Sequence, residues 1–276
     1  MTEHTGMHPR PSPQGSVPPF LEFSGVTVFH GDTRVLDALS VTIQQGEHVA
    51  ILGPNGAGKS SFIKTITREF YPCLNKGEVT FRICGKDVWD VFMLRSAFGV
   101  VSNDLQYTYT RAITGREVIL SGFFSSIGLF NREITSEMNR KADEIIAFLE
   151  IGHISDRPMN EMSSGESRRF LIGRAMVHDP KVLILDEPTN SLDLHALHTF
   201  RQTIRKIARS GTGIILVTHS LPDIIPEIGR VILMKNGKFV GDGRKEDILT
   251  DRHIGRLFDV PVQVKEENGY YYATGY

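Results

Sequence analysis

The apolar positions of the chain fall into short continuous runs and longer helical patterns. Three segments, EHVAILG (47–53), KVLILDEP (181–188) and GTGIILVTHS (211–220), each contain four adjacent apolar residues. Runs of this length, bounded by glycine or polar residues, are typical of strands that are buried on both faces of a parallel sheet. Helical spacing is found at 59–70 and at about 195–209. The alternation predicts an α/β protein with a mostly parallel sheet.

Other strands are predicted on either side of these runs. The segments 20–30 and 34–43 alternate between apolar and polar residues and contain many β-branched residues, which indicates a small β layer at the start of the chain. A further strand is expected within 77–88. Residues 231–243 predict a hairpin, because two strand-like segments flank an Asn-Gly turn at 236–237.

Helical patterns dominate from about residue 89 to 165, where we expect a helical insertion that also contains the strand AFGVVS (97–102). One face of a helix would carry the residues at helical spacing, namely Met138, Ala142, Ile145, Ile146 and Leu149. The folded domain is expected to cover 19–250. The remaining residues, 251–276, would be a C-terminal extension that forms either a short strand pair or an interaction tail.

Composition narrows the classes of partner. The 276 residues carry a net charge of −1, so the chain offers no basic field for nucleic acid, and no nucleic-acid partner is expected. No apolar run reaches the ~18 residues of a membrane-spanning helix, and contact with a membrane would therefore require a protein partner. Residues 1–18 are rich in proline, serine and histidine and lack the apolar region of a signal peptide, which predicts a disordered tail.

The strongest chemical signal is the segment GPNGAGKSS (53–61), which matches the P-loop pattern between a buried strand and a helix. Glycines allow the backbone N–H groups to surround phosphates, and the helix start adds the positive end of its dipole. Lys59 would place a charge between the β- and γ-phosphates, and the Ser60 hydroxyl would bind Mg²⁺. The residues predicted to bind the phosphates are Gly53, Pro54, Asn55, Gly56, Ala57, Gly58, Lys59, Ser60 and Ser61.

Two more strands end in groups that suit phosphate chemistry. The strand VLIL delivers Asp186 and Glu187 to the carboxyl edge of the sheet, where α/β proteins bind ligands. Asp186 would hold Mg²⁺, directly or through water, and Glu187 would polarise the attacking water as general base. His219 ends the strand GIILVTHS at the same edge, where it would lie close to a γ-phosphate. A solvated acidic turn and a structural histidine are the alternatives.

The P-loop, SSGES before a helix, LILDEPTNSLD and VTHS occur in this order, and together they resemble the ATP-binding cassette (ABC) family of ATPases. The resemblance covers about residues 20–245. It implies a P-loop NTPase fold with a RecA-like core, an antiparallel β subdomain and a helical subdomain. It also implies that two copies pair head to tail and enclose two ATP molecules, each between one copy's P-loop and the other's signature motif.

The resemblance assigns further site residues. Ser163, Ser164, Gly165 and Glu166 match the signature, and Ser163 would donate to the γ-phosphate held by the partner. Ser163 and Glu166 also have the spacing of a capping box, which caps the helix that follows. Residues 191–193, which include Asp193, match the loop that crosses the dimer interface, and His219 matches the switch histidine. Phe29 occupies about the position of the aromatic residue that stacks on adenine, with strand packing as the alternative.

Two departures from the family pattern bear on the roles of site residues, and a third, Ser61 where threonine is common, is expected to be silent. Many relatives have glutamine where this chain has Glu166, and a carboxylate lacks the amide donors, so we expect its role to be structural or directed at the ribose. The Mg²⁺-sensing glutamine expected after strand 97–102 is Asn103 by alignment. Gln106 lies three residues later, and either residue could serve as the additional Mg²⁺ ligand.

The resemblance implies an ATPase subunit of an ABC transporter, docked through its helical insertion on separate transmembrane permease subunits. It would lie at the cytoplasmic face of the cell membrane, with ATP and Mg²⁺ as cofactors. Segment 119–130 resembles cassettes for uptake of metals, metal oxyanions or siderophores, which favours import and a substrate-binding protein as a further partner. The alternatives are a soluble cassette ATPase acting on DNA or ribosomes and, more remotely, a P-loop kinase of small metabolites.

Overall fold

The computed structural model describes residues 17–73, 79–102, 113–129 and 131–276. A six-stranded sheet lies at the centre of this part of the chain, in the order β5-β6-β7-β3-β8-β9. Its first five strands run parallel, and β9 pairs antiparallel with β8 at the edge. The strands are β3 (His48–Leu52), β5 (Phe98–Ser102), β6 (Val182–Asp186), β7 (Gly213–Thr218), β8 (Arg230–Lys235) and β9 (Lys238–Arg244).

The three apolar runs form the central strands β3, β6 and β7, as predicted. Every residue of β7 is buried, and so are four of the five in β3 and in β6. Successive residues of a strand point to opposite faces, and the structure accordingly has a separate apolar core on each face of the sheet. Ala50 and Leu52 of β3 join one core, while Val49 and Ile51 join the other. The sheet is therefore covered on both sides.

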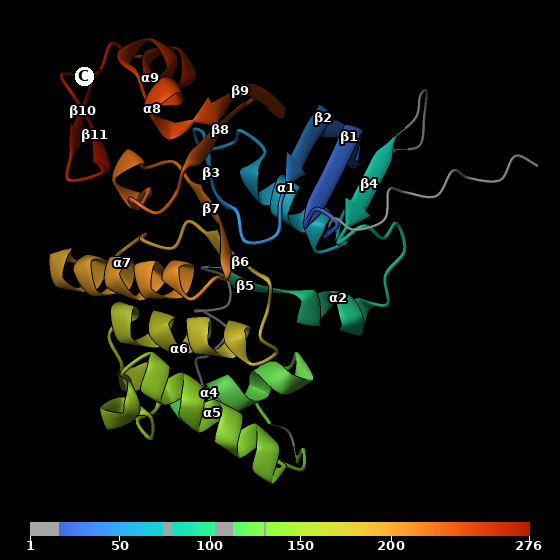
Figure 1. The fold of residues 1–276 in the computed structure, drawn as a ribbon, viewed down its shortest axis with the longest axis vertical. Helices are drawn as coiled ribbons and strands as arrows, with labels where there is room; N and C mark the ends of the chain where they lie inside the picture. Colours follow the sequence, from blue (N-terminus) through green and yellow to red (C-terminus); the bar gives the residue numbers. More distant parts are fainter. Residues whose placement is uncertain (1–16, 74–78, 103–112, 130) are drawn as a thin grey trace, which may run out of the picture.

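One core lies beneath a three-stranded antiparallel sheet of order β2-β1-β4, at the upper right of Figure 1. Its strands are β1 (Leu21–His30), β2 (Thr33–Ile43) and β4 (Thr80–Ile83). Helix α1 (Lys59–Ile66) lies between the two sheets, and its Phe62 ring packs edge-on against Phe23 of β1, with centroids 5.7 Å apart. This confirms the small β layer and places it against the helix that follows the P-loop.

Helices cover the other face of the central sheet, in the lower half of Figure 1. The predicted apolar face 138–149 is confirmed, since Ala142, Ile145, Ile146 and Leu149 are buried and Met138 packs against them. Strand β5 pairs with β6, so the expected insertion at 89–165 includes one strand of the central sheet. The helices of this face are α4 (Gly115–Ser121), α5 (Ser136–Phe148), α6 (Ser164–Met176) and α7 (Leu194–Arg209), with short 3-10 turns η1 (Gly122–Phe124), η2 (Gly152–Ile154) and η3 (Met159–Glu161). Helix α2 (Val91–Ala97) places its buried Leu94 in the core beneath the antiparallel sheet instead.

Two element ends differ from the predictions. Helix α1 ends at Ile66 and not near Phe70, because Arg68 takes a left-handed backbone (φ 63°) and lays its guanidinium over the Phe81 ring, 3.6 Å from the centroid. The strand expected within 77–88 is limited to Thr80–Ile83, because the chain reverses at Cys84 and Gly85, both with positive φ.

The predicted Asn-Gly hairpin is confirmed, and its turn is tied to the rest of the fold. Gly237 donates its N–H to the Ala57 carbonyl in the P-loop at 2.8 Å and accepts a hydrogen bond from the Asp37 N–H at 2.9 Å. A Cβ at Gly237 would lie 2.8 Å from the Val35 carbonyl oxygen. The turn therefore joins the P-loop to the antiparallel sheet.

The chain beyond β7 ends in a strand pair, one of the two forms expected for the C-terminal extension. Strands β10 (Gln263–Glu267) and β11 (Tyr270–Thr274) pair antiparallel, and Tyr271 is buried against the helical core. Strand β11 lies beside the 3-10 turn η4 (Leu221–Asp223), which follows β7. The helices α8 (Lys245–Ile248) and α9 (Asp251–Phe258), which were not predicted, precede them.

The tail predicted for 1–18 falls almost wholly outside the described residues. Within the described ranges, no helix is both long and apolar enough to cross a bilayer.

Candidate active site

The P-loop connects β3 to α1 and leaves the start of that helix without a side-chain cap. Gly58 is the N-cap residue, with φ of +104°, and it has no side chain to bond the first helical amides. The loop is held from behind, because Gly53 donates its N–H to the Thr218 carbonyl of β7 at 3.2 Å. The first amides of a helix form an anion site when no side chain occupies them. The loop therefore presents such a site at the carboxyl edge of the sheet.

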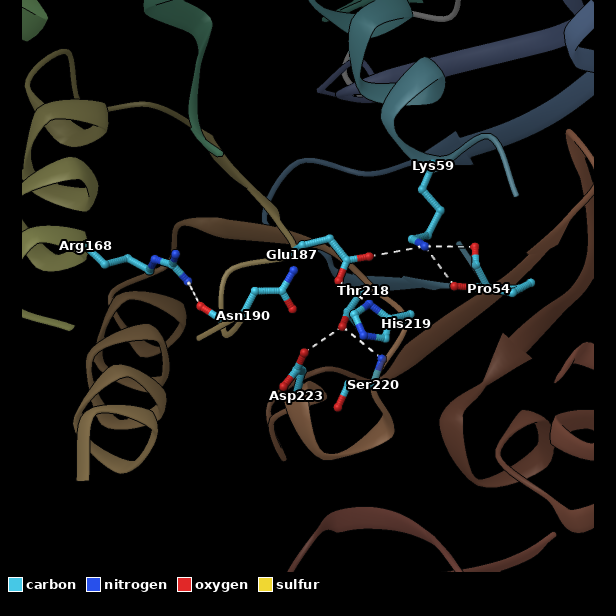
Figure 2. A network of polar contacts seen from close by, with 10 residues as sticks. Pro54, Lys59, Arg168, Glu187, Asn190, Thr218, His219, Ser220 and Asp223 are labelled. Atoms are coloured by element: carbon cyan, nitrogen blue, oxygen red, sulfur yellow. Dashed lines mark hydrogen bonds and ion pairs between the residues drawn. The ribbon is translucent and has the colours of Figure 1, made fainter. Parts of the chain in front are cut away.

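Lys59 is the first residue of α1, and its side chain is turned into the loop. It is only 6% exposed, and its ammonium group donates to the carbonyls of Gly53 at 2.8 Å and Pro54 at 3.0 Å. The same group lies 3.2 Å from Glu187 Oε1 (Figure 2). A buried ammonium group requires such partners, because burial without them would disfavour its charge.

Glu187 links Lys59 to His219. Its second carboxylate oxygen, Oε2, lies 2.5 Å from His219 Nδ1 (Figure 2). Exposure of the side chains rises along this series, from 6% at Lys59 through 16% at Glu187 to 39% at His219. The sequence placed these three residues at one sheet edge, and the structure brings them into direct contact. A carboxylate held in this way is oriented for proton abstraction from a water molecule.

Strand β6 positions its two acidic residues differently. Asp186 is the last residue of the strand and pairs in register with Ser102 and Val217 of the neighbouring strands. Glu187 follows with a left-handed backbone (φ 48°), and its N–H bonds the Val217 carbonyl at 2.8 Å. A non-glycine residue in this conformation carries backbone strain, which is common at functional positions.

Arg168 supports the loop after Glu187 and was not identified from the sequence. This residue of α6 is 3% exposed, and its guanidinium donates to the Pro188 carbonyl and lies 3.5 Å from the Asn190 carbonyl (Figure 2). A signal was available, since Arg168 shares helical spacing with the buried residues Leu171 and Ile172 and therefore faces the core. Helix α6 is thus bonded directly to the loop that follows Glu187.

Asp223 was also missed. It lies in η4, four residues after His219, and is buried. Thr218 donates its hydroxyl to Asp223 Oδ2 at 2.6 Å and accepts a hydrogen bond from the Ser220 N–H at 3.0 Å. The backbone on both sides of His219 is therefore connected to one buried carboxyl group.

The signature motif forms the predicted capping box at the start of α6. Ser163 Oγ accepts from the Glu166 N–H at 3.2 Å, and the Glu166 carboxylate accepts from the Ser163 N–H at 2.8 Å. The backbone hydrogen bond from Ser163 lowers the pKa of Glu166, with smaller contributions from the Ser163 hydroxyl and from Arg157, whose Nη1 is 3.5 Å away. The prediction that Glu166 has a structural role is consistent with these contacts.

The start of α6 packs against the start of α7, through contacts that involve neither Lys59 nor Glu187. Ser164 Oγ donates to the Ser191 carbonyl at 3.4 Å, and Asp193 caps α7 by accepting from the Ala196 N–H at 2.8 Å. A Cβ at Gly165 would lie 2.7 Å from the Ala196 Cβ, so this approach requires glycine. The next residue, Leu194, is 86% exposed.

The remaining predicted site residues are placed as follows. Phe29 is near the end of β1 and 46% exposed, so its ring is accessible, and adenine stacking stays a prediction. Asn55, Gly56 and Ser60 are exposed on the P-loop and the first turn of α1. Asn103 and Gln106 lie outside the described residues.

The residues at this edge fit a magnesium-bound nucleoside triphosphate. The uncapped start of α1 and the Lys59 ammonium suit phosphate oxygens. The Ser60 hydroxyl and the Asp186 carboxylate supply oxygen ligands of the kind that Mg²⁺ prefers. Bound there, the ion would offset phosphate charge. The fold and this site together define a P-loop NTPase.

The comparisons with known proteins narrow this class. The family model described as "ABC transporter" matches residues 36–190. The chain belongs to this family and is an ATP-binding, ATP-hydrolysing subunit. It is 31% identical over 246 residues to the uncharacterized ABC transporter ATP-binding protein YlmA of Bacillus subtilis, with 88% of this chain and 92% of that protein covered.

Two other relatives carry more specific names. Nod factor export ATP-binding protein I of Rhizobium johnstonii is 30% identical over 246 residues, with 87% of this chain and 75% of that protein covered. Hemin import ATP-binding protein HmuV of Bradyrhizobium diazoefficiens is 28% identical over 251 residues, with 88% and 90% covered.

Solved structures agree with the family assignment. A nucleotide-free ATP-binding cassette from an ABC transporter is 25% identical, with a TM-score of 0.71 and with 88% of this chain and 96% of that chain covered. A dimeric cassette in a post-hydrolysis state, bound to ADP and phosphate, is also 25% identical, with a TM-score of 0.65 and coverage of 81% and 98%.

Proposed function

We propose that this chain drives solute movement through separate transmembrane permease subunits at the cytoplasmic face of the membrane. The observation that carries the proposal is the contact series from Lys59 through Glu187 to His219 beside the uncapped start of α1. In this series Glu187 is the general base for the attacking water. Lys59 binds the β- and γ-phosphates, and His219 orients Glu187 and the γ-phosphate.

Mg²⁺ would be held by Ser60 and Asp186, with Asn103 or Gln106 as a further ligand. ATP would lie on residues 53–61 with its adenine against Phe29. These roles are consistent with the donor types and accessibility described above for the residues within the described ranges.

Two copies would pair head to tail, so that Ser163, Ser164, Gly165 and Asp193 of one copy complete the site of the other. Two observations support this pairing. The start of α6 is capped by its own residues, and the exposed Leu194 lies beside Asp193 at the start of α7. A relative of known structure is a dimeric cassette bound to the products of hydrolysis. ATP would hold the pair together, and hydrolysis would release it.

Import is the direction that we propose, with a metal, metal-oxyanion or siderophore-like solute delivered by a substrate-binding protein. The features that support it are the resemblance of segment 119–130 to uptake cassettes and the hemin-import relative. Relatives named for Nod factor export represent the opposite direction. Ile127, which is 45% exposed in the helical layer, offers an apolar contact for the permease.

Purification of the tagged chain from detergent-solubilised membranes tests this function. We expect a multi-span protein encoded next to its gene to co-purify, and we expect ATP-dependent uptake when both are reconstituted in vesicles. Efflux instead of uptake in the same vesicles would contradict the proposed import direction. Co-sedimentation with ribosomes or DNA, without a membrane partner, would favour the cassette ATPases that act on those substrates.

A further inference from the structure

Asp223 lies beside the end of the strand that leads to His219. It ends η4, the short turn after β7, and is only 7% exposed. Thr218, which donates its hydroxyl to Asp223 Oδ2 at 2.6 Å, immediately precedes His219. The Thr189 side chain, two residues after Glu187, lowers the pKa of the same carboxyl group. The Asp223 carboxyl thus bridges η4 and the end of β7, directly before His219.

The same bridge extends through the backbone after His219. The Ser220 N–H donates to Thr218 Oγ1 at 3.0 Å, so the Thr218 hydroxyl both donates and accepts (Figure 2). Burial raises the pKa of Asp223, and the Thr218 and Thr189 side chains act in the opposite direction. A buried carboxyl retains a fixed orientation only when such donors satisfy it.

The C-terminal strand pair holds η4 in place from outside. Arg201 of α7 donates to the Pro222 carbonyl, and its guanidinium lies over the Tyr270 ring of β11, 4.8 Å from the centroid. At the β10–β11 turn, a Cβ on Gly269 would come within 3.0 Å of Pro226. The strand pair and α7 therefore fix the turn that carries Asp223.

We propose that Asp223 is a positioning residue, which fixes the end of β7 before His219 and so sets the contact between the His219 and Glu187 side chains. The inference rests on the roles proposed above for Glu187 and His219. Asp223 touches neither of the reacting groups directly in this arrangement. Its effect passes through Thr218, which immediately precedes His219.

Substitution of Asp223 tests the bridge with two readouts. In Asp223→Ala the Thr218 hydroxyl loses its acceptor, and we expect kcat for ATP hydrolysis to fall roughly 10- to 100-fold, because small displacements of catalytic groups cost this much. We expect KM for ATP to change little. Asp223→Asn keeps an acceptor oxygen and should restore most of the turnover.

The second readout is the His219 imidazole signal in NMR spectra of histidine-labelled protein. The chain has 10 histidines, and comparison with His219→Ala identifies the signal of interest. We expect the signal to shift in Asp223→Ala and to stay near its native position in Asp223→Asn. An unshifted signal in Asp223→Ala would overturn the proposal. A shifted signal with unchanged turnover would support the bridge and reject the catalytic role of His219.

The variant Thr218→Val distinguishes loss of the bridge from a folding defect in Asp223→Ala. It removes the hydroxyl that Asp223 accepts from and should shift the His219 signal and lower kcat by a smaller factor. Thr203→Val is the matched control, because the Thr203 hydroxyl is also part-buried but bonds the Thr199 carbonyl within α7. Equal effects of the two valine variants would contradict the bridge.

Discussion

Helices α1 and α6 both begin at a motif that the ABC family uses for nucleotide binding, yet their first turns are completed in opposite ways. The N-cap of α1 is Gly58, which has no side chain to offer the helical amides. The N-cap of α6 is Ser163, which exchanges hydrogen bonds with Glu166 in a complete capping box. The first helix start leaves its amides to a ligand, whereas the second is stable on its own and needs no ligand to form.

The comparison predicts that changes near α1 affect chemistry and that changes near α6 affect assembly and stability. Glu187→Gln should give the largest effect, because it removes the proposed base beside α1 while keeping the size of the side chain. We expect turnover to fall by about 10²- to 10⁴-fold, with ATP binding intact and an ATP-bound dimer favoured.

Phosphate release, nucleotide binding and size-exclusion chromatography with ATP would measure these three quantities. Glu133→Gln, at an exposed position, is the matched control. If the Glu187→Gln protein hydrolysed ATP at the wild-type rate, Glu187 would not be the general base.

The second prediction asks whether the start of α6 works in the partner's site. A Ser163→Arg chain and a Lys59→Ala chain should each be inactive alone, and an equal mixture should recover about a quarter of wild-type activity, because half of the dimers would be mixed and each would hold one intact site. Steady-state hydrolysis of the mixture checks this.

Thr135→Arg provides the matched control, since Thr135 is the N-cap of α5 and likewise accepts from the third residue of its helix. That chain should stay active. No activity in the mixture above that of either mutant would reject the composite site or the independence of the two sites.

The third prediction concerns Arg168 of α6, which bonds the loop after Glu187 and so links the two regions. Arg168→Met keeps the length of the side chain but leaves the Pro188 and Asn190 carbonyls without this donor. We expect the free energy of unfolding to fall by about 1–3 kcal/mol and kcat to fall several-fold, as judged by denaturant titration and hydrolysis assays. The exposed Arg140, paired with Glu144 one turn later, supplies the control Arg140→Met, whose unfolding free energy should change by less than about 1 kcal/mol.

The smallest effect is expected from Glu166→Gln. Glutamine can complete the capping box, so only the charge is lost, at a cost of about 0.3–1 kcal/mol at a helix start. The folded state lowers the pKa of Glu166, so its charge stabilises the fold above the unfolded pKa, and this contribution disappears as pH falls through the folded pKa.

Thermal unfolding of both proteins between pH 7 and pH 3 would show the effect. The difference in Tm should shrink on the acid side of about pH 4, near the ordinary pKa of glutamate. A difference that grows with acid would contradict the assignment.

The central strands and the meeting of Lys59, Glu187 and His219 could be predicted from the sequence. Buried parallel strands have a local signal in their apolar runs, and such strands end at a common edge of the sheet. The side chains placed at the ends of β3, β6 and β7 therefore had to converge.

The parts that could not be predicted depend on contacts between distant segments. Helix α1 ends early because Arg68, just after the helix, stacks on Phe81 of strand β4, and the two residues lie 13 positions apart in the printed sequence. Arg168 and Asp223 act on loops of other elements, and neither contact leaves a periodic pattern. Sequence patterns report which face of an element is buried, but they do not report which loop a buried polar side chain will reach.

The Asn-Gly turn at 236–237 has a practical consequence for protein engineering. Hairpin tips are usually chosen for inserted tags or fused domains. At this tip, however, both backbone hydrogen-bonding groups of Gly237 are used, one by the P-loop residue Ala57 and the other by Asp37. An epitope inserted at this turn would disturb the hydrogen bond to Ala57 and with it the backbone of the P-loop. The turn at Ser210 and Gly211, whose N–H groups bond only carbonyls at the end of α7, is the better place for a label or an attachment handle.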